Sequence, residues 1–168
     1  MATHLVWFRA DLRIHDNLAL AAACRDPHAR VLGLFIATPG QWRQHGMAPR
    51  QAAFMVSHLH SLQAALAEKG IPLQIEHAED FTASVELLVS ICRQQQVTHL
   101  FYNYQYEINE RQRDAAVERT LAEVTCQGFD DSVLLPPGSV LTGSREMYKV
   151  FTPFKNAFIR RLQEALPE

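Results

Sequence analysis

The 168-residue sequence lacks the features that mark several classes of protein. Its three cysteines are scattered and form no CxxC pair, which argues against a disulfide framework and against a zinc site of the usual spacing. No apolar run is long enough to cross a bilayer, so no membrane association is expected. Strand-like residues begin at His4 with no basic segment before them, so we expect no signal peptide, a cytoplasmic location and buried, reduced thiols.

Glycine-rich loops and clusters of positive charge are also missing. The seven glycines form neither GxGxxG nor GxxxxGKT/S, so the usual cradle for a pyrophosphate or triphosphate is not present. The formal net charge is −2, and no basic cluster is larger than the pair Arg160 and Arg161. Since nucleic-acid binding depends strongly on neutralising phosphates, we expect this chain alone to bind DNA poorly.

What the sequence does contain is an alternation of strand and helix patterns. Strands are predicted at residues 4–8, 30–36, 72–76, 98–102 and 133–135, the third of them at an edge of the sheet. Helices are predicted at residues 17–24, 49–69, 81–96, 108–124 and from 152 onward, with residues 41–47 as a loop. This order predicts one α/β domain with a doubly wound, Rossmann-like sheet of five parallel strands and helices on both faces.

Charged side chains crowd the turn that follows the first predicted strand. For Asp11, Arg13 and Asp16 we predict a structural role, in which salt bridges hold the turn and Asp16 caps the following helix. Arg9 directly follows the strand, and ligands of parallel sheets gather at the carboxyl ends of strands. Arg9 is therefore predicted to border a ligand cleft, or the turn to meet a partner domain.

The segment from Tyr102 to Arg111 is the most unusual local sequence, and it also follows a predicted strand. Asn109 and Glu110 suit a flat heteroaromatic ligand, because a carboxylate can accept two parallel hydrogen bonds and an amide can both donate and accept. Asn109 is equally suited to be a helix N-cap, with Gln112 completing a capping box. The two roles are compatible if the ligand lies above the start of the helix.

No residue is predicted to be a metal ligand or a catalytic group. His58 and His60 lie on one predicted helix at a spacing that points them to different faces, which does not favour a metal site. No Ser-His-Asp or Cys-His arrangement can be assembled from the sequence.

Four motifs in order carry a resemblance to a known family: LVWFRADLRIHDNLAL, FYNYQYEINER, GFDDSVLLPPGS and MYKVFTPFKNAF. Together they resemble the N-terminal α/β domain of the photolyase/cryptochrome family. They are most similar to bacterial class I cyclobutane pyrimidine dimer photolyases of the folate-antenna type. The resemblance spans nearly the whole chain, so we expect residues 1–168 to form such an antenna domain.

The resemblance implies a light-harvesting function. It assigns a 5,10-methenyltetrahydrofolate site to Asn109, Glu110 and His45, with Arg9 at the border of the chromophore cleft. The folate would pass excitation to FAD in a covalently linked helical domain, which this chain does not contain. That helical domain would also bind ultraviolet-damaged DNA, so the parent flavoprotein would be a deoxyribodipyrimidine photo-lyase, a carbon-carbon lyase. We expect the 168-residue chain to be a monomer that does not itself repair DNA.

Other interpretations of the sequence remain open. A cryptochrome-type blue-light sensor would share this domain, and a deazaflavin antenna is disfavoured only by the match at His45, Asn109 and Glu110. A nucleotide-binding α/β enzyme would bind ATP or a flavin nucleotide tightly, although the missing glycine-rich loop counts against it. A plain interaction domain with an empty cleft would be indifferent to changes at Glu110.

Overall fold

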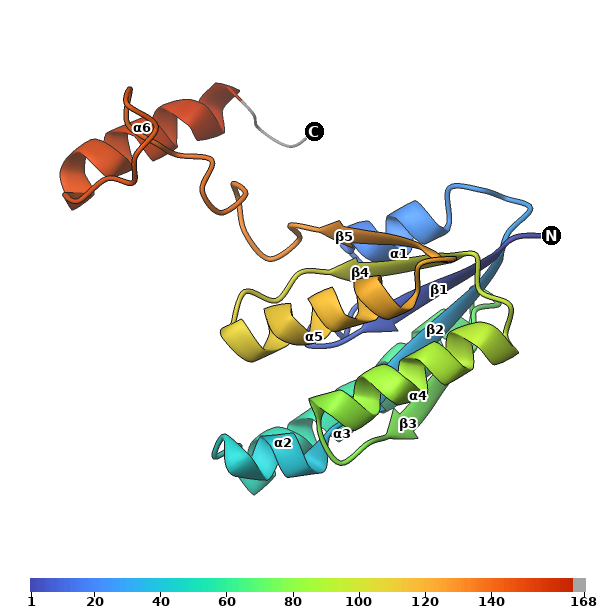
Figure 1. Ribbon diagram of the computed structural model, residues 1–168. Coiled ribbons are helices and arrows are strands. Elements are labelled where there is room, and N and C mark those ends of the chain that lie inside the picture. Colours follow the sequence, from blue (N-terminus) through green and yellow to red (C-terminus); the bar gives the residue numbers. More distant parts are fainter. Residues whose placement is uncertain (165–168) are drawn as a thin grey trace. The chain divides into compact units, whose positions relative to one another are not determined.

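The computed structural model describes residues 1–164, which form two compact units. The first unit is Met1–Phe129 and the second begins at Asp130. The first unit contains a sheet of five parallel strands: β1 (Thr3–Phe8), β2 (Arg30–Ala37), β3 (Leu73–His77), β4 (His99–Asn103) and β5 (Thr125–Phe129). Their order across the sheet is β3-β2-β1-β4-β5, which confirms the predicted fold class and the edge position of β3 (Figure 1).

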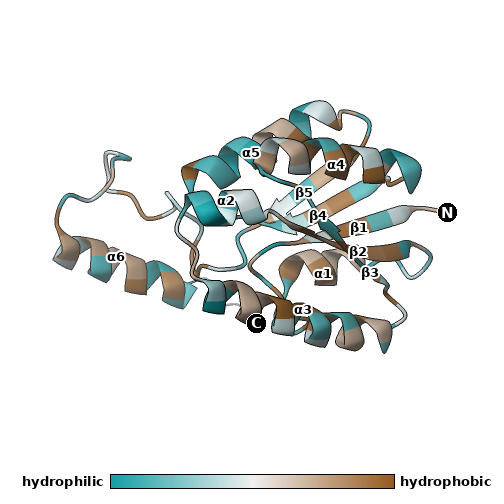
Figure 2. Cartoon of the chain, turned by 90° about the horizontal axis from the view of Figure 1, so that it is seen from below, coloured by the Kyte–Doolittle hydropathy of each residue, from teal (hydrophilic) through white to brown (hydrophobic). Residues whose placement is uncertain are grey.

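Helices cover both faces of this sheet, as the hydrophobic pattern predicts. One face carries α1 (Leu18–Ala23) and α3 (Pro49–Ala67), and the other carries α4 (Phe81–Gln94) and α5 (Ile108–Thr120) (Figure 2). A strand inside such a sandwich must be apolar on both sides. In β1, Leu5 and Trp7 pack towards α4 and α5, whereas Val6 and Phe8 pack towards α1 and α3.

The strand order creates a switch point between β1 and β4. The chain moves from β1 outward to β2 and β3 through helices on one face, and then returns to β4 and β5 through helices on the other face. The segments that leave the carboxyl ends of β1 and β4 therefore turn to opposite faces and leave a crevice between them. Open α/β sheets bind ligands at such a crevice.

The prediction of a last strand at residues 133–135 is wrong. The fifth strand is β5, which pairs with β4 from Thr125 to Phe129. Gly128 lies inside β5, where a Cβ atom would collide with the ring of Tyr104. A glycine in a strand often marks such a close approach. Packing, not chain reversal, is therefore the reason for glycine at this position.

The prediction of a loop over residues 41–47 is also wrong, because α2 (Pro39–Gln44) occupies most of it. Pro39 begins this helix at a position where the missing N–H has no cost. Gly46 ends it in a left-handed conformation with φ of 70°, and its N–H donates to the Arg43 carbonyl. The N–H of Met47 donates to the Trp42 carbonyl, which completes a Schellman motif.

Two smaller expectations also need correction. Asn17, not Asp16, caps α1, and its side-chain oxygen accepts a hydrogen bond of 3.0 Å from the Leu20 N–H. Asp16 instead has a positive φ in the turn before the cap. Of the thiols, Cys92 is buried, which raises its pKa to about 12, but Cys24 is exposed.

The second unit contains α6 (Phe151–Glu164), which begins one residue before the predicted start at residue 152. Phe154 of this helix lies 5.9 Å from Phe158 and 6.2 Å from Tyr148, which precedes the helix, measured between ring centroids. None of the helices within residues 1–164 is both long and apolar enough to cross a membrane.

Candidate chromophore cleft at the switch point

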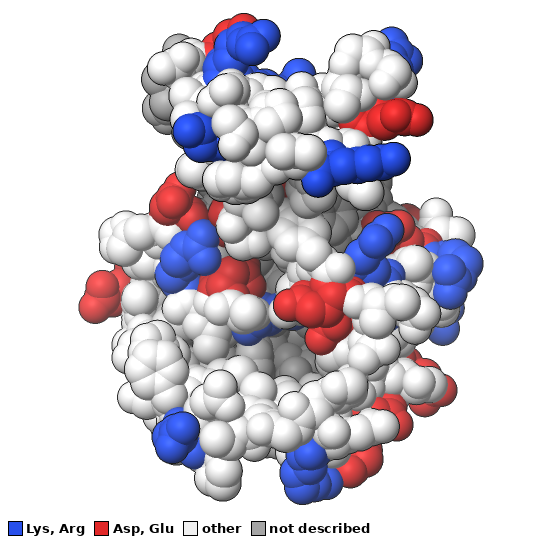
Figure 3. All heavy atoms as spheres, turned by 90° about the vertical axis from the view of Figure 1, so that its left-hand side faces the viewer, with Lys and Arg blue, Asp and Glu red and all other residues white. Residues whose placement is uncertain are grey.

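A cleft of ≈ 580 Å³ opens at the carboxyl edge of the sheet, where β1, β2 and β4 end. Figure 3 faces this edge and shows acidic and basic side chains around a hollow in the surface. The cleft is within the size range of small-molecule sites, and it is lined by polar and charged side chains together with apolar and aromatic ones. Its aromatic residues are Phe35, Trp42 and Phe81.

All four residues predicted from the sequence line this cleft. Arg9 follows β1, His45 is the C-cap residue of α2, and Asn109 and Glu110 lie in the first turn of α5. Three segments far apart in sequence thus meet at one opening. This convergence is what a binding site requires, and the binding role of each residue stays a prediction.

The predicted capping role of Asn109 is wrong. The N-cap residue of α5 is Glu107, whose backbone carbonyl accepts a hydrogen bond of 3.0 Å from the Arg111 N–H. Asn109 is the second residue of the helix, and Glu110 is the third. Within residues 1–164, no hydrogen bond joins the Asn109 or Glu110 side chain to another residue. The polar groups of both side chains are therefore available to a ligand.

The position of His45 depends on the close packing of α2. A Cβ atom at Gly40 would collide with the backbone carbonyl of Glu79, in the segment between β3 and α4. The Gln41 N–H donates to that same carbonyl at 3.3 Å, and Arg43 forms an exposed ion pair of 2.9 Å with the Glu79 carboxylate. These contacts hold α2 beside the start of α4, so His45 lies at the rim of the cleft.

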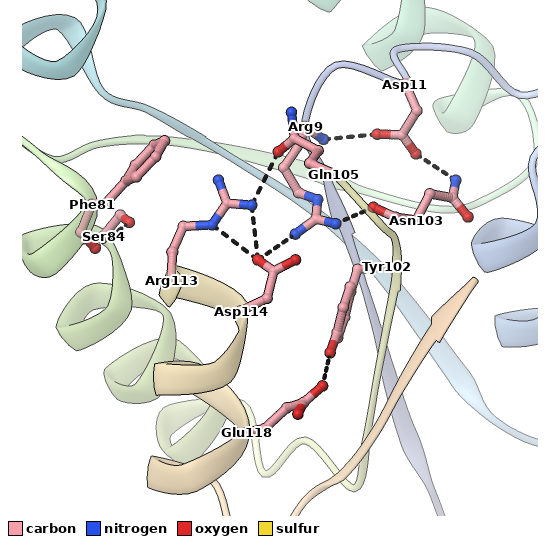
Figure 4. Close-up of polar contacts among 10 residues, drawn as sticks. All are labelled: Arg9, Asp11, Phe81, Ser84, Tyr102, Asn103, Gln105, Arg113, Asp114 and Glu118. Carbon is pink, nitrogen blue, oxygen red and sulfur yellow. Dashed lines mark hydrogen bonds and ion pairs between the residues drawn. The ribbon is translucent and has the colours of Figure 1, made fainter. Parts of the chain in front are cut away.

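Arg9 and Arg113 are buried and line the floor of the cleft, and the buried carboxylate of Asp114 joins them. We call these three residues the arginine cluster (Figure 4). One oxygen of Asp114, Oδ1, accepts hydrogen bonds from Arg9 Nη1 at 3.0 Å and from Arg113 Nε and Nη2 at 3.0 and 2.8 Å. Arg9 also donates to the Asn103 carbonyl at the end of β4, and Arg113 donates to Gln105 at 3.0 Å. The cluster therefore joins β1, α5 and the segment between β4 and α5.

Aromatic rings hold the two guanidinium groups in place. The guanidinium carbons of Arg9 and Arg113 lie 4.7 and 4.6 Å from the ring centroid of Trp7. Arg9 also lies 4.9 Å from the Tyr102 ring, and Arg113 lies 4.8 Å from the Phe81 ring. Cation–π contacts of this kind are stronger where water is excluded. Each cation is thus held by a carboxylate and by two aromatic rings.

The charges of the arginine cluster do not balance, since two guanidinium groups share one carboxylate. Burial lowers the pKa of Arg9 from its ordinary value, and the charge of Asp114 opposes that effect. Arginine still keeps its proton at neutral pH. Among the described residues, Arg9 Nε and Asp114 Oδ2 are buried without a hydrogen-bond partner. These three side chains together carry one excess positive charge, and the nearby carboxylate of Asp11, which accepts from the Arg9 backbone N–H, does not line the cleft.

Asp11 has a structural role in a neighbouring polar network, but within residues 1–164 it acts through hydrogen bonds and not through the salt bridge predicted for it. Its carboxylate accepts hydrogen bonds from the Arg9 backbone N–H at 2.9 Å and from the Asn103 side chain at 2.6 Å. Asn103 also donates to the Asn17 side chain at 3.0 Å. Arg13 donates to the backbone carbonyl of Asp16 at 2.8 Å. Hydrogen bonds thus tie the turn after β1 to the end of β4.

Sequence reasoning missed Gln105, Arg113 and Asp114. A signal for the last two was present, because they follow Asn109 and Glu110 by four residues, the spacing that places side chains on one helix face. The pairing of Arg113 with Trp7 carries no such signal. It depends on two segments that meet only in the folded sheet.

Two further hollows adjoin the cleft. One of ≈ 730 Å³ shares His45, Asn109 and Arg113 with it, so these residues border both. The other, of ≈ 790 Å³, lies along α3 and is mostly apolar, with the exposed side chain of Phe54 at its edge.

Within residues 1–164, no group of three or more His, Cys, Asp or Glu residues is arranged to hold a metal ion.

Comparison with known proteins identifies relatives over the whole chain. The deoxyribodipyrimidine photo-lyase of Salmonella typhimurium is 68% identical over 99% of this chain, and that of Escherichia coli is 66% identical over 100% of it. The matched part is 35% and 36% of those two proteins, so the chain spans about a third of the length of the curated relatives it matches.

Solved structures agree on the fold. A cryptochrome from Synechocystis superposes with a TM-score of 0.82 at 21% identity, over 96% of this chain and 34% of the other. A class III photolyase from Agrobacterium tumefaciens superposes with a TM-score of 0.71 at 25% identity, over 98% of this chain and 32% of the other. The DNA photolyase family model matches residues 4–168. With this match over nearly its full length, the chain belongs to the DNA photolyase family, in which it corresponds to the N-terminal α/β domain.

Proposed function

We propose that residues 1–168 form the light-harvesting domain of a deoxyribodipyrimidine photo-lyase and bind 5,10-methenyltetrahydrofolate in the cleft at the switch point. The observation that carries this proposal is the convergence of Arg9, His45, Asn109 and Glu110 on one cleft. The curated relatives at 66–68% identity are photo-lyases, which favours this function over that of a cryptochrome-type sensor.

The donor groups at the rim fit a pterin. The Glu110 carboxylate can accept hydrogen bonds from a ring N–H and the adjacent amino group, and the Asn109 amide can both donate and accept. His45 would flank the ring from the side of α2. The pigment, when bound, supplies the light absorption, and the chain holds and orients it.

The remaining steps belong to the rest of the protein. The chain matches about a third of its photo-lyase relatives, and we propose that the remaining two thirds supply a helical domain that binds FAD and damaged DNA. A formal net charge of −2 is consistent with DNA contacts lying elsewhere. We further propose that the protein is a monomer and acts in the cytoplasm, where bacterial DNA lies.

The experiment that tests the proposal is an absorption titration of the chain with methenyltetrahydrofolate, in parallel with Glu110→Gln. We expect a saturable band shift, and a Kd increase of about ten- to a hundredfold in the variant, since hydrogen bonds to a charged group contribute about 1.5–3 kcal/mol.

The matched control is Glu68→Gln, which removes the same charge from the exposed C-cap residue of α3, at the opposite edge of the sheet. This variant should bind like the unmodified chain. Absence of a saturable shift in the unmodified chain, or equal affinity in Glu110→Gln, contradicts the proposal. Tight binding of ATP or FAD without folate binding would favour the nucleotide-binding alternative.

A further inference from the structure

We propose that the arginine cluster tunes the absorption maximum of the bound pigment through the excess positive charge at the floor of the cleft. This inference rests on the proposed function, since it concerns the same cleft. It gives Arg9, Arg113 and Asp114 a positioning and tuning role that is separate from the binding role of the rim. The pigment need not form a hydrogen bond to any of them.

The first step in the argument is that the charge is fixed in place. The Arg113 guanidinium lies between the rings of Trp7 and Phe81, at 4.6 and 4.8 Å from their centroids. Its N–H groups are held by Asp114 and Gln105 at 2.8–3.0 Å. Its side chain is only 5% exposed, yet it lines the cleft. Because the guanidinium is held in one position, its charge lies at the same place relative to the cleft in every molecule.

The second step is the sign of the field across the cleft. The floor has two guanidinium groups and one carboxylate, whereas the rim has the carboxylates of Glu107 and Glu110. Asp11 adds a negative charge near Arg9, where its carboxylate accepts hydrogen bonds from the Arg9 backbone and from Asn103. Neither Asp11 nor Asp114 lines the cleft, however, whereas both guanidinium groups do. The field therefore runs from a positive floor to a negative rim.

The third step is the response of a pigment. A conjugated ring redistributes charge between its ground and excited states, so a fixed charge beside it stabilises the two states unequally. Charges near a cofactor ring are among the means by which proteins tune its electronics. The effect is stronger beside buried groups such as Arg9 and Arg113 than in bulk water, because the local dielectric constant is lower. Changes of opposite sign at the floor should shift the absorption maximum in opposite directions.

Three variants test this inference in the 168-residue chain, each titrated to saturation with methenyltetrahydrofolate. Asp114→Asn makes the floor more positive by one charge, and Arg113→Gln makes it less positive by one. We expect their absorption maxima to move in opposite directions from that of the unmodified chain. Arg113→Lys keeps the charge and should leave the maximum close to its original position.

Arg119→Gln is the matched control for charge alone. It removes one positive charge from the same helix, but at an exposed position in its last turn and away from the cleft. Its absorption maximum should not move. A shift equal to that of Arg113→Gln would show that net charge, and not the floor, is responsible, which would overturn the inference.

The outcomes separate the inference from the proposed function. Saturable binding with unshifted maxima, or with both maxima displaced in the same direction, overturns the inference and leaves the proposed function standing. No binding by the unmodified chain overturns both. If Asp114→Asn fails to fold, as judged by circular dichroism, the contrast between Arg113→Gln and Arg113→Lys decides the question, because a purely structural role would predict no spectral difference between two folded variants.

Discussion

The floor and the rim of the cleft lie one helical turn apart on α5, but their side chains have opposite environments. Arg113 and Asp114 are buried and joined to each other, to β1 and to the segment after β4. Asn109 and Glu110 are partly exposed, and no hydrogen bond joins their side chains to another residue within the described part of the chain. One turn of helix thus separates side chains that hold the fold from side chains that are available to a ligand.

The difference has a simple physical origin. A buried charge is tolerated only where partners replace the lost hydration, and at the floor the ion pairs, hydrogen bonds and aromatic rings serve this purpose. A ligand site needs the reverse, because a polar group already bonded to the protein gains little from a ligand. The floor should therefore govern stability, and the rim should govern affinity.

The strongest test of this division is Asp114→Ala. It leaves two buried guanidinium groups without their shared carboxylate, and removal of one partner from a buried ion pair costs about 3–5 kcal/mol. We expect the free energy of unfolding, measured by urea denaturation, to fall by that amount.

Glu123→Ala is its matched control, since it breaks an ion pair with Arg93 of 3.7 Å in which both side chains are at least 60% exposed. Exposed pairs contribute less than about 1 kcal/mol. Equal losses in Asp114→Ala and Glu123→Ala would mean that the floor does not stabilise the domain.

A smaller effect is expected at alkaline pH from Tyr102, whose ring lies against Arg9 and whose hydroxyl donates to Glu118. Burial, and then the hydrogen bond to Glu118, raise the pKa of Tyr102 above its ordinary value of 10.0. In the folded chain the phenol keeps its proton, whereas in the unfolded chain it loses the proton above that value. This contribution to stability is complete below pH 10 and declines as the pH rises, by up to about 1.4 kcal/mol per pH unit.

Tyr102→Phe removes the group responsible. Its free energy of unfolding should decline less steeply than that of the unmodified chain when both are measured from about pH 8 to about pH 11. Identical slopes would show that the phenol ionises in the folded chain as easily as in water.

The smallest effect on stability is expected at the rim, from Asn109→Ala. Because Asn109 is not the cap of α5, we expect the free energy of unfolding to change by less than about 0.5 kcal/mol. Folate binding should weaken by about two- to tenfold, as for the loss of one neutral hydrogen bond. Arg111→Ala, two residues further on and exposed, should change neither quantity. A large decrease in the free energy of unfolding of Asn109→Ala would indicate that Asn109 has a structural role.

An element could be predicted from the sequence where interactions between near neighbours determine it, and could not where contacts between distant segments determine it. The strands β1 to β4 and the helices α1, α3, α4 and α5 were predictable, since each bears a hydrophobic pattern set by near neighbours. The helix α2 was missed because Pro39 and Gly40 are also a turn signal. The strand β5 was missed because the reason for Gly128 is the ring of Tyr104, which the local pattern does not reveal.

The candidate rim could be found from residue types alone, because His45, Asn109 and Glu110 each follow a strand, and strand ends of a parallel sheet share an edge. The floor required the folded chain. Arg9 meets Asp114 across 105 positions and the Asn103 carbonyl across 94. No periodicity in the sequence links residues so far apart. The partners of a buried charge are the groups that lie next to it in the folded domain. Local pattern thus specified most of the elements and the candidate rim at the strand ends, whereas the charge at the floor of the cleft arose only when β1, β4 and α5 packed together.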